Sequence, residues 1–201
     1  MLAMNRPRHF DLDSLRECVT DVFTEHGYRG TSMSMLSDAS GLGKQSLYNA
    51  IGDKEAAYLQ SLECASARNA GLRALMLDAT NGRQALEGFF AKVVEFATSP
   101  DPAQHSCIFT AGLMEGIDSD AVAAKLQEKW HELCMLMQST VERGQRDGSI
   151  RADVPSAALR DVLTTLFLGL RVASRTHSER QALTTTVLWV MKLLDKGAPT
   201  P

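Results

Sequence analysis

The positions of the prolines constrain this chain more than any other feature of its sequence. Its 201 residues contain six prolines, and the long runs 8–99, 103–154 and 156–198 contain none. Proline inside a helix costs about 3 kcal/mol, so long runs without it are typical of helices. Strand candidates are scarce, and the best of them, residues 107–110, is too short to be persuasive. The sequence therefore predicts an all-α fold.

Apolar periodicity and capping residues divide the chain into helices. A first helix is expected from Asp11 or Asp13, with Gly27 as a left-handed residue at its end. Asp53 is expected to cap a long fourth helix that joins two domains. The domains are a three-helix head at residues 1–55 and a second helical domain at residues 56–201. The other helices are expected over residues 33–40, 43–50, 85–98, 120–146, 155–175 and 178–195.

Charge and composition exclude several classes of protein. The chain has 21 Lys+Arg against 24 Asp+Glu, a net charge of −3, which excludes a polycation that grips nucleic acid over its whole surface. The four cysteines form no CxxC pair, so we expect reduced thiols and no metal site. No apolar run reaches the ~18 residues of a membrane span, and no secretory segment precedes Arg6. We expect a cytoplasmic protein without membrane contact.

Residues 23–55 carry the pattern that points to a function. Two short helices flank Gly41, and Leu36, Leu42 and Leu47 are spaced so that they clamp the pair together. This is a helix-turn-helix pattern, whose second helix fits the major groove of DNA. Spacing alone is equally compatible with an ordinary helical hairpin that has a glycine turn. A helix-turn-helix that binds another protein is a further alternative.

Six short motifs in this segment stand at a characteristic spacing. They are Gly27-Tyr28, Thr31-Ser32, Gly41-Leu42, Lys44, Ser46-Leu47-Tyr48 and Asp53-Lys54-Glu55. With these motifs, roughly the first 60 residues resemble the TetR family of bacterial transcriptional regulators. The resemblance implies an all-α homodimer with an N-terminal DNA-binding domain and a C-terminal domain that binds a small effector. It also implies a repressor that the effector releases from a palindromic operator.

The resemblance assigns DNA contacts to individual side chains of the head. It implies phosphate contacts from Thr31, Ser32, Tyr48 and Lys54. The alternatives are that Thr31 is only a helix cap, that Lys54 is only an exposed charge and that Tyr48 packs into a core. Exposed polar residues of the third helix are the candidates for base edges: Lys44, Gln45 and Asn49, with Ser46 beside them.

Two positions depart from the family pattern. Ala50 stands where many members have histidine, so we expect no phosphate contact there. Ile51 stands where many have phenylalanine, and it keeps the hydrophobic anchor. Arg6 and Arg8 are compatible with a minor-groove arm or with a solvated tail.

The effector pocket is expected among the middle helices. The candidates for a soft, polarizable lining suited to an apolar or aromatic effector, with an ordinary core as the alternative for most of them, are Phe90, Cys107, Phe109, Met114, Trp130, Cys134 and Met137. His105 and Glu115 are candidates for polar contacts. Cys107, near the predicted start of a helix, is a candidate sensor of electrophiles, with an inert buried thiol as the alternative.

The last two helices, about residues 156–195, carry apolar stripes. These stripes fit an intramolecular core and a dimer interface equally, and the resemblance favours the dimer. The first 60 residues hold six Lys+Arg and eight Asp+Glu, a net charge of −2, so few phosphates are neutralised per subunit. Two subunits on half-sites ~34–36 Å apart, or a multiple of that, are therefore expected to supply the affinity.

An enzyme or a ligand-binding helical protein without DNA activity is the alternative from another class. Glu128 and His131 stand three residues apart, as in di-iron helical bundles, but this pair occurs once. No glycine-rich phosphate loop, GxSxG or HExxH motif is present. We therefore expect no enzyme activity and no cofactor.

Overall fold

The computed structural model describes residues 11–101, 104, 106–176 and 179–197. Within these ranges the chain forms helices and no strand, which confirms the all-α prediction. The strand candidate at residues 107–110 instead forms the N-cap and first turn of a helix. The elements are α1 (Leu12–Gly30), α2 (Met33–Ser40), α3 (Lys44–Ile51), α4 (Lys54–Arg68), α5 (Ala70–Asp78), α6 (Gly82–Ala97), α7 (Ile108–Glu115), α8 (Asp120–Asp147), α9 (Ser156–Ala173), η2 (Ser174–Thr176) and α10 (Arg180–Lys192).

Short polar side chains fix where the helices of the head begin. Asp11 Oδ1 accepts a hydrogen bond from the N–H of Asp13 at 3.2 Å, so the expected start of α1 is confirmed. Ser32 Oγ accepts from the N–H of Met35 at the start of α2. Asp53 caps α4 as predicted. Each cap satisfies an amide that the first turn of a helix leaves without a partner.

The head has its own apolar core, which we call the head cluster. Its centre is aromatic: the ring centroids of Phe23 and Tyr28 each lie 5.0 Å from that of Tyr58, in edge-to-face geometry. The cluster continues past residue 55, the boundary expected from the sequence, and takes residues from α4, α7 and α8. Its buried members are Leu15, Val19, Phe23, Leu36, Leu47, Ile51, Ala57, Tyr58, Leu62, Ala65, Ile108, Val122 and Leu126.

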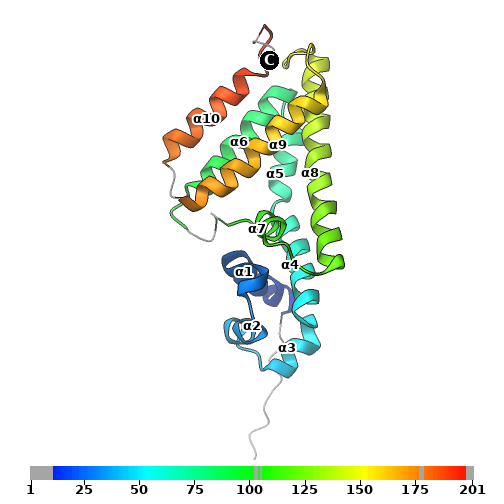
Figure 1. The fold of residues 1–201 in the computed structure, drawn as a ribbon, viewed down its shortest axis with the longest axis vertical. Helices are drawn as coiled ribbons and strands as arrows, with labels where there is room; N and C mark the ends of the chain where they lie inside the picture. The colour runs from blue at the N-terminus through cyan, green and yellow to red at the C-terminus, as the bar shows by residue number, and fades with distance from the viewer. Residues whose placement is uncertain (1–10, 102–103, 105, 177–178, 198–201) are drawn as a thin grey trace, which may run out of the picture.

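The C-terminal half has a second and larger core. Figure 1 shows α6, α8 and α9 packed side by side with α10 on the outer side, while α3 lies at the far end of the molecule. α4 is shorter than expected, because it ends at Arg68 and α5 begins at Ala70. α7 packs against α1, so a short helix connects the two halves beside α4.

The apolar stripes of the last two helices are for the most part internal. Their inner faces fill the core of the C-terminal half, which is the intramolecular alternative given for these stripes. The members of the stripes that are buried there are Leu159, Leu163, Leu170, Leu183, Val187, Met191 and Leu194. Separately, none of the helices in the described part of the chain is long and apolar enough to cross a membrane.

Candidate DNA-binding surface

α2 and α3 form a rigid pair around a glycine turn. Gly41 has φ 68° and ψ 12°, the left-handed conformation that glycine adopts without steric cost. Leu36 and Leu47 are completely buried between the helices, and Leu42 packs against them. Ser37 Oγ donates to the carbonyl of Leu42 and ties the turn to α2. The expected leucine clamp is confirmed.

α3 presents one polar face outward and one apolar face inward. Leu47 and Ile51 are buried, so the helix is anchored along one side, and Ile51 is the anchor that was expected. The predicted contact residues on its outer side are all exposed: Lys44, Gln45, Ser46, Tyr48 and Asn49. This face has the size and chemistry of a helix that enters a major groove.

The outward side chains are free to meet a partner. Gln45 Nε2 donates to Asn49 Oδ1 at 3.2 Å, which holds two amide groups together on one strip of the helix. Tyr48 is 45% exposed, and its hydroxyl makes no hydrogen bond with any described residue. Lys44 likewise forms no ion pair within the described part of the chain. The strip therefore offers donors and acceptors that the protein itself does not use.

Ser32 and Lys54 flank this strip at the starts of α2 and α4. The Ser32 hydroxyl accepts from Met35 and keeps its own proton for another acceptor. Lys54 Nζ lies 4.5 Å from the ring centroid of Tyr28. Partial burial lowers the pKa of Lys54, and the Glu115 carboxylate opposes that shift. Lys54 makes no ion pair with the residues that the structure describes, so its ammonium group is available to an anion.

The expected phosphate contact of Thr31 is corrected, because the side chain of Thr31 points inward. It is 2% exposed, and its hydroxyl donates to the carbonyl of Gly27 at 2.7 Å. Its N–H donates to Tyr28 at 3.3 Å. Both donors are used inside the head, so Thr31 positions the start of α2 and is withdrawn from the expected phosphate contacts. The arm residues Arg6 and Arg8 lie outside the described residues.

The side chains expected to line an effector pocket do not form one lining. Phe90 and Met137 are completely buried in the core of the C-terminal half. Phe109 packs on the head cluster instead. Met114 is 64% exposed near the end of α7, which corrects its expected place in a pocket. The polar candidate His105 lies outside the described residues.

The three remaining residues expected in the pocket are half-buried. Trp130 and Cys134 lie on α8, where burial raises the pKa of the Cys134 thiol. Cys107 is the N-cap residue of α7, so its expected place at a helix start is confirmed. All four cysteines are free thiols.

Glu115 has a structural role that the sequence did not reveal. α1 breaks at Gly27, which has φ 73° and ψ 178°; the positive φ was expected, but this ψ is not left-handed helical. The amides after the break point at α7, and those of Tyr28 and Arg29 donate to Glu115 Oε1 and Oε2 at 3.1 and 2.9 Å. We call this contact the Glu115 latch. It corrects the expectation that Glu115 contacts an effector, and it fastens α7 to the head.

Tyr58 makes a second connection to α7 and was also missed from the sequence. Its hydroxyl donates to the carbonyl of Ile108, the first residue of α7, at 3.2 Å. Burial raises the pKa of Tyr58, and nearby acidic groups add to the shift. The Tyr28 and Tyr58 rings pack together, so the latch and this hydrogen bond are parts of one contact surface.

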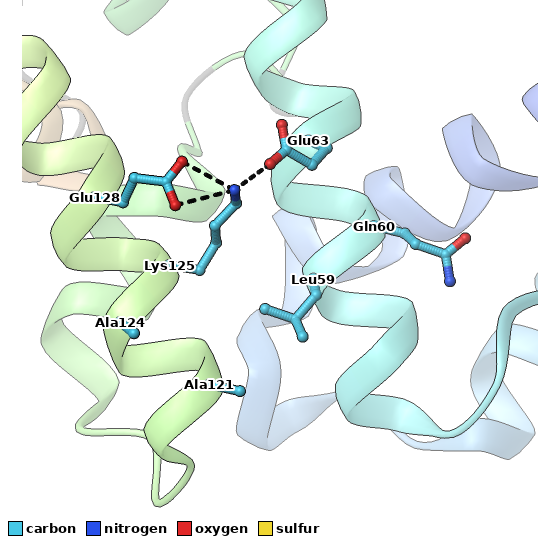
Figure 2. Close-up of a pocket in the computed structure, with 7 residues that line it drawn as sticks. All are labelled: Leu59, Gln60, Glu63, Ala121, Ala124, Lys125 and Glu128. Carbon is cyan, nitrogen blue, oxygen red and sulfur yellow. Dashed lines mark hydrogen bonds and ion pairs between the residues drawn. The ribbon is translucent and has the colours of Figure 1, made fainter.

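A shallow groove of about 450 Å³ runs between α4 and α8. Figure 2 shows the Lys125 ammonium group between the carboxylates of Glu63 and Glu128 at one end of the groove. Leu59 forms part of its apolar floor. None of the expected effector residues lines this groove. Glu128, considered above beside His131, is engaged by Lys125.

The geometry of α2 and α3 is that of a helix-turn-helix, the motif that defines a class of DNA-binding transcriptional regulators. Two family descriptions match the chain and narrow the class. "Bacterial regulatory proteins, tetR family" matches residues 20–59, and "Tetracyclin repressor-like, C-terminal domain" matches residues 82–188, more than half of the chain. The chain belongs to the TetR family. It is a transcriptional regulator and not an enzyme.

Individual relatives agree with this assignment. The HTH-type transcriptional repressor ComR of Escherichia coli is 24% identical over 93% of this chain and 92% of its own. The uncharacterized HTH-type regulator YezE of Bacillus subtilis is 27% identical over 63% of this chain and 65% of its own length. A cysteine mutant of the TetR family regulator CifR, solved with 26-bp double-strand operator DNA, superimposes with a TM-score of 0.84. Its identity is 27%, over 96% of this chain and 100% of that chain.

Proposed function

We propose that this protein is a dimeric repressor that binds a palindromic operator through α3 and leaves it when a small-molecule effector binds the C-terminal half. The exposed polar strip of α3 carries the proposal, because it combines unused hydrogen-bonding groups with a rigid, buried back. The repressor ComR and the operator complex of CifR support it as similar proteins. The protein would act in the cytoplasm, where operator DNA lies.

The DNA contacts divide into two kinds. Lys44, Gln45 and Asn49 would read base edges, because Lys pairs with guanine and the amides pair with adenine. Tyr48 and Lys54, with Ser32 and Ser46 near them, would hold phosphates and set the register. This division is testable, since base contacts change the preferred sequence and phosphate contacts change affinity for all sequences alike.

The dimer would form through the outer faces of α9 and α10. The inner faces of these helices fill the core, but Leu188 is 59% and Trp189 63% exposed, and Val162 and Val172 are also exposed. Large apolar side chains that stay exposed on two neighbouring helices are typical of a protein interface. Paired copies would place two α3 helices on successive half-sites, which offsets the small number of basic residues in each acidic head.

Selection of genomic DNA fragments on the immobilised full-length protein tests the proposal. We expect enrichment of a palindrome. Tyr48→Phe and Lys54→Ala should each weaken operator binding by about three- to tenfold without changing the enriched sequence. Gln45→Ala should cost about 1–3 kcal/mol and relax the preference at one position of each half-site.

Gln127→Ala is the matched control, because Gln127 is an exposed glutamine on α8, outside the helices that carry the proposed DNA contacts. It should leave both affinity and the enriched sequence unchanged. Failure to enrich any palindrome would contradict the proposal, and so would an unchanged sequence preference in Gln45→Ala, Lys44→Ala and Asn49→Ala alike.

A further inference from the structure

Arg171, in the last turn of α9, is a buried cation that has no counter-charge among the described residues. Arg171 is only 9% exposed, and its Nη2 donates a hydrogen bond to the carbonyl of Ser106 at 2.8 Å. Its Nε is buried and has no hydrogen-bond partner. No carboxylate among the described residues forms an ion pair with it. Burying an unpaired charge is costly, so proteins seldom keep one without a use.

Arg143 is a useful comparison, because the fold itself stabilises its side chain. Its Nε is also buried and unpartnered, but Nη1 and Nη2 donate to the carbonyls of Leu77 and Met76 at 3.1 and 2.7 Å. Those carbonyls belong to the last turn of α5, the negative end of a helix dipole, where a cation is stabilised. Arg143 is therefore explained by the fold alone.

Arg171 belongs to the last turn of α9, but its guanidinium group reaches across to Ser106, beside the opposite kind of helix end. Ser106 precedes Cys107, the N-cap of α7, and the N-terminus of a helix carries positive potential. Cys107 forms no side-chain cap hydrogen bond, and the first turn of α7 has no acidic residue. Arg175 adds a second guanidinium group, because its Nη2 donates to Ser106 Oγ at 3.3 Å. Two arginines and the free amides of a helix start thus converge on one short segment.

We propose that this segment binds the carboxylate or phosphate group of a small-molecule effector. An oxyanion there would supply the charge that Arg171 lacks and accept hydrogen bonds from the first amides of α7. We call this the α7 anion site. The proposal rests on the proposed function for its regulatory meaning, because it names the chemistry of the effector.

The position of the site also explains how anion binding at the start of α7 would affect the head. α7 is a short helix with the anion site at its start and the Glu115 latch at its end. The hydroxyl of Tyr58 donates a hydrogen bond to the carbonyl of Ile108, the first residue of the same helix. A ligand that prefers one placement of α7 would therefore bias the head through both contacts. The size of the effect is limited by the difference in its affinity for the two placements.

Calorimetric titration of the full-length protein without DNA tests the site. The probes are sodium benzoate and inorganic phosphate, at constant ionic strength, with neutral benzamide as the uncharged match for benzoate. We expect saturable binding of at least one anion and none of benzamide. Arg171→Gln should weaken the binding by about tenfold or more, because a charge-assisted hydrogen bond is lost.

Two further variants separate a binding role from a structural one. Arg143→Gln removes the other arginine with a buried Nε and should leave anion binding unchanged. Arg175→Gln removes an exposed side chain, so it should fold normally, and it should weaken binding by about two- to threefold. The two anions distinguish a carboxylate effector from a phosphate effector. Absence of saturable binding of both anions, or equal binding by wild type and Arg171→Gln, would overturn the proposal.

Operator binding is measured separately by fluorescence anisotropy on the selected palindrome. The anion that binds should lower operator affinity of the wild type but not of Arg171→Gln. If it binds and leaves operator affinity unchanged, the effector role is overturned while operator recognition stands. If the protein binds no operator, the proposed function fails, and the titration without DNA still decides whether the anion site exists.

Discussion

The two ends of the molecule present opposite surfaces. The outer side of α3 is polar: the Tyr48 hydroxyl and the Lys44 ammonium group make no bond with the described residues, and the side-chain amides of Gln45 and Asn49 bond only to each other. The outer side of α10 carries two large apolar side chains, Leu188 and Trp189, each more than half exposed. A polar strip over a buried anchor is stable in water and suits a hydrated, charged partner. An apolar strip in the same position gains free energy when another apolar surface covers it.

The largest expected effect comes from putting a charge into the apolar strip. Trp189→Glu should convert the dimer to a monomer, because an interface would have to bury an unpaired carboxylate. Operator affinity should fall by about 1,000-fold, since the two heads would no longer bind as one unit. Sedimentation velocity measures the mass, and anisotropy measures the affinity.

Leu77→Glu is the control for this substitution. Leu77 on α5 is 55% exposed but lies outside α9 and α10. The variant should keep the mass and the operator affinity of the wild type. A monomeric wild type, or an unchanged mass in Trp189→Glu, would contradict the assignment of the dimer surface.

The next largest effect concerns the connection between the two ends. Gly27→Ala should lower the free energy of unfolding by about 2–3 kcal/mol, because φ 73° is strained for alanine. The added methyl group would also overlap Glu115 Oε1 and open the Glu115 latch. Urea denaturation measures the loss. Gly71→Ala, in a helix with open space around it, should instead raise stability slightly. Equal effects of the two substitutions would argue against the latch.

The head was predictable because its signals are local. Asp11, Gly41 and Asp53 act on amides or turns within a few residues of themselves, so each can be recognised from its neighbours in the sequence. Leu36 and Leu47 are also close in sequence and meet across one turn. Thr31 was misassigned because a cap and a buried hydroxyl look alike in sequence. The hydroxyl of Thr31 donates to the carbonyl of Gly27, the residue at which α1 breaks.

The helices of the C-terminal half could be predicted from the sequence, but not which of their apolar side chains are exposed. Each apolar stripe shows that a helix has an inner face, but the stripe does not say which side chains another helix covers. Leu188 directly follows the buried Val187 on α10, although Leu188 itself is exposed. The contact of Glu115 with Tyr28 joins residues 87 positions apart, and no periodicity reports such a pairing.

Tyr58→Phe should have a moderate effect that depends on pH. Loss of the hydrogen bond to Ile108 should lower the free energy of unfolding by about 1 kcal/mol at neutral pH. Burial raises the pKa of Tyr58, so the folded protein keeps a proton that the unfolded chain loses above about pH 10. The stabilisation from this group is therefore present below that pH and is lost as pH rises.

The free energy of unfolding, measured between pH 8 and 11, checks the direction of this pH dependence. The wild type should lose stability more steeply than Tyr58→Phe above pH 10. Some alkaline loss should remain in the variant, because burial also raises the pKa of Tyr28. Tyr48→Phe is the control, since Tyr48 is exposed and bonded to nothing in the described structure. Parallel curves for the wild type and Tyr58→Phe would contradict the buried hydrogen bond.

The smallest expected effect is at the groove between α4 and α8, where the two halves meet through exposed charges (Figure 2). Lys125 pairs with Glu63 and Glu128, and the lysine lowers the pKa of Glu63 by hydrogen bonding. Both carboxylates are about half exposed, so water and salt screen the pairs. Lys125→Met should therefore cost at most about 0.5 kcal/mol, and the cost should shrink in 1 M salt. Because the lowered pKa favours the ionised Glu63, the wild-type advantage should fade as pH drops below about 4. A loss of 2 kcal/mol or more in urea denaturation would show that charges, and not the apolar contacts of α7 and α4, hold the head in place.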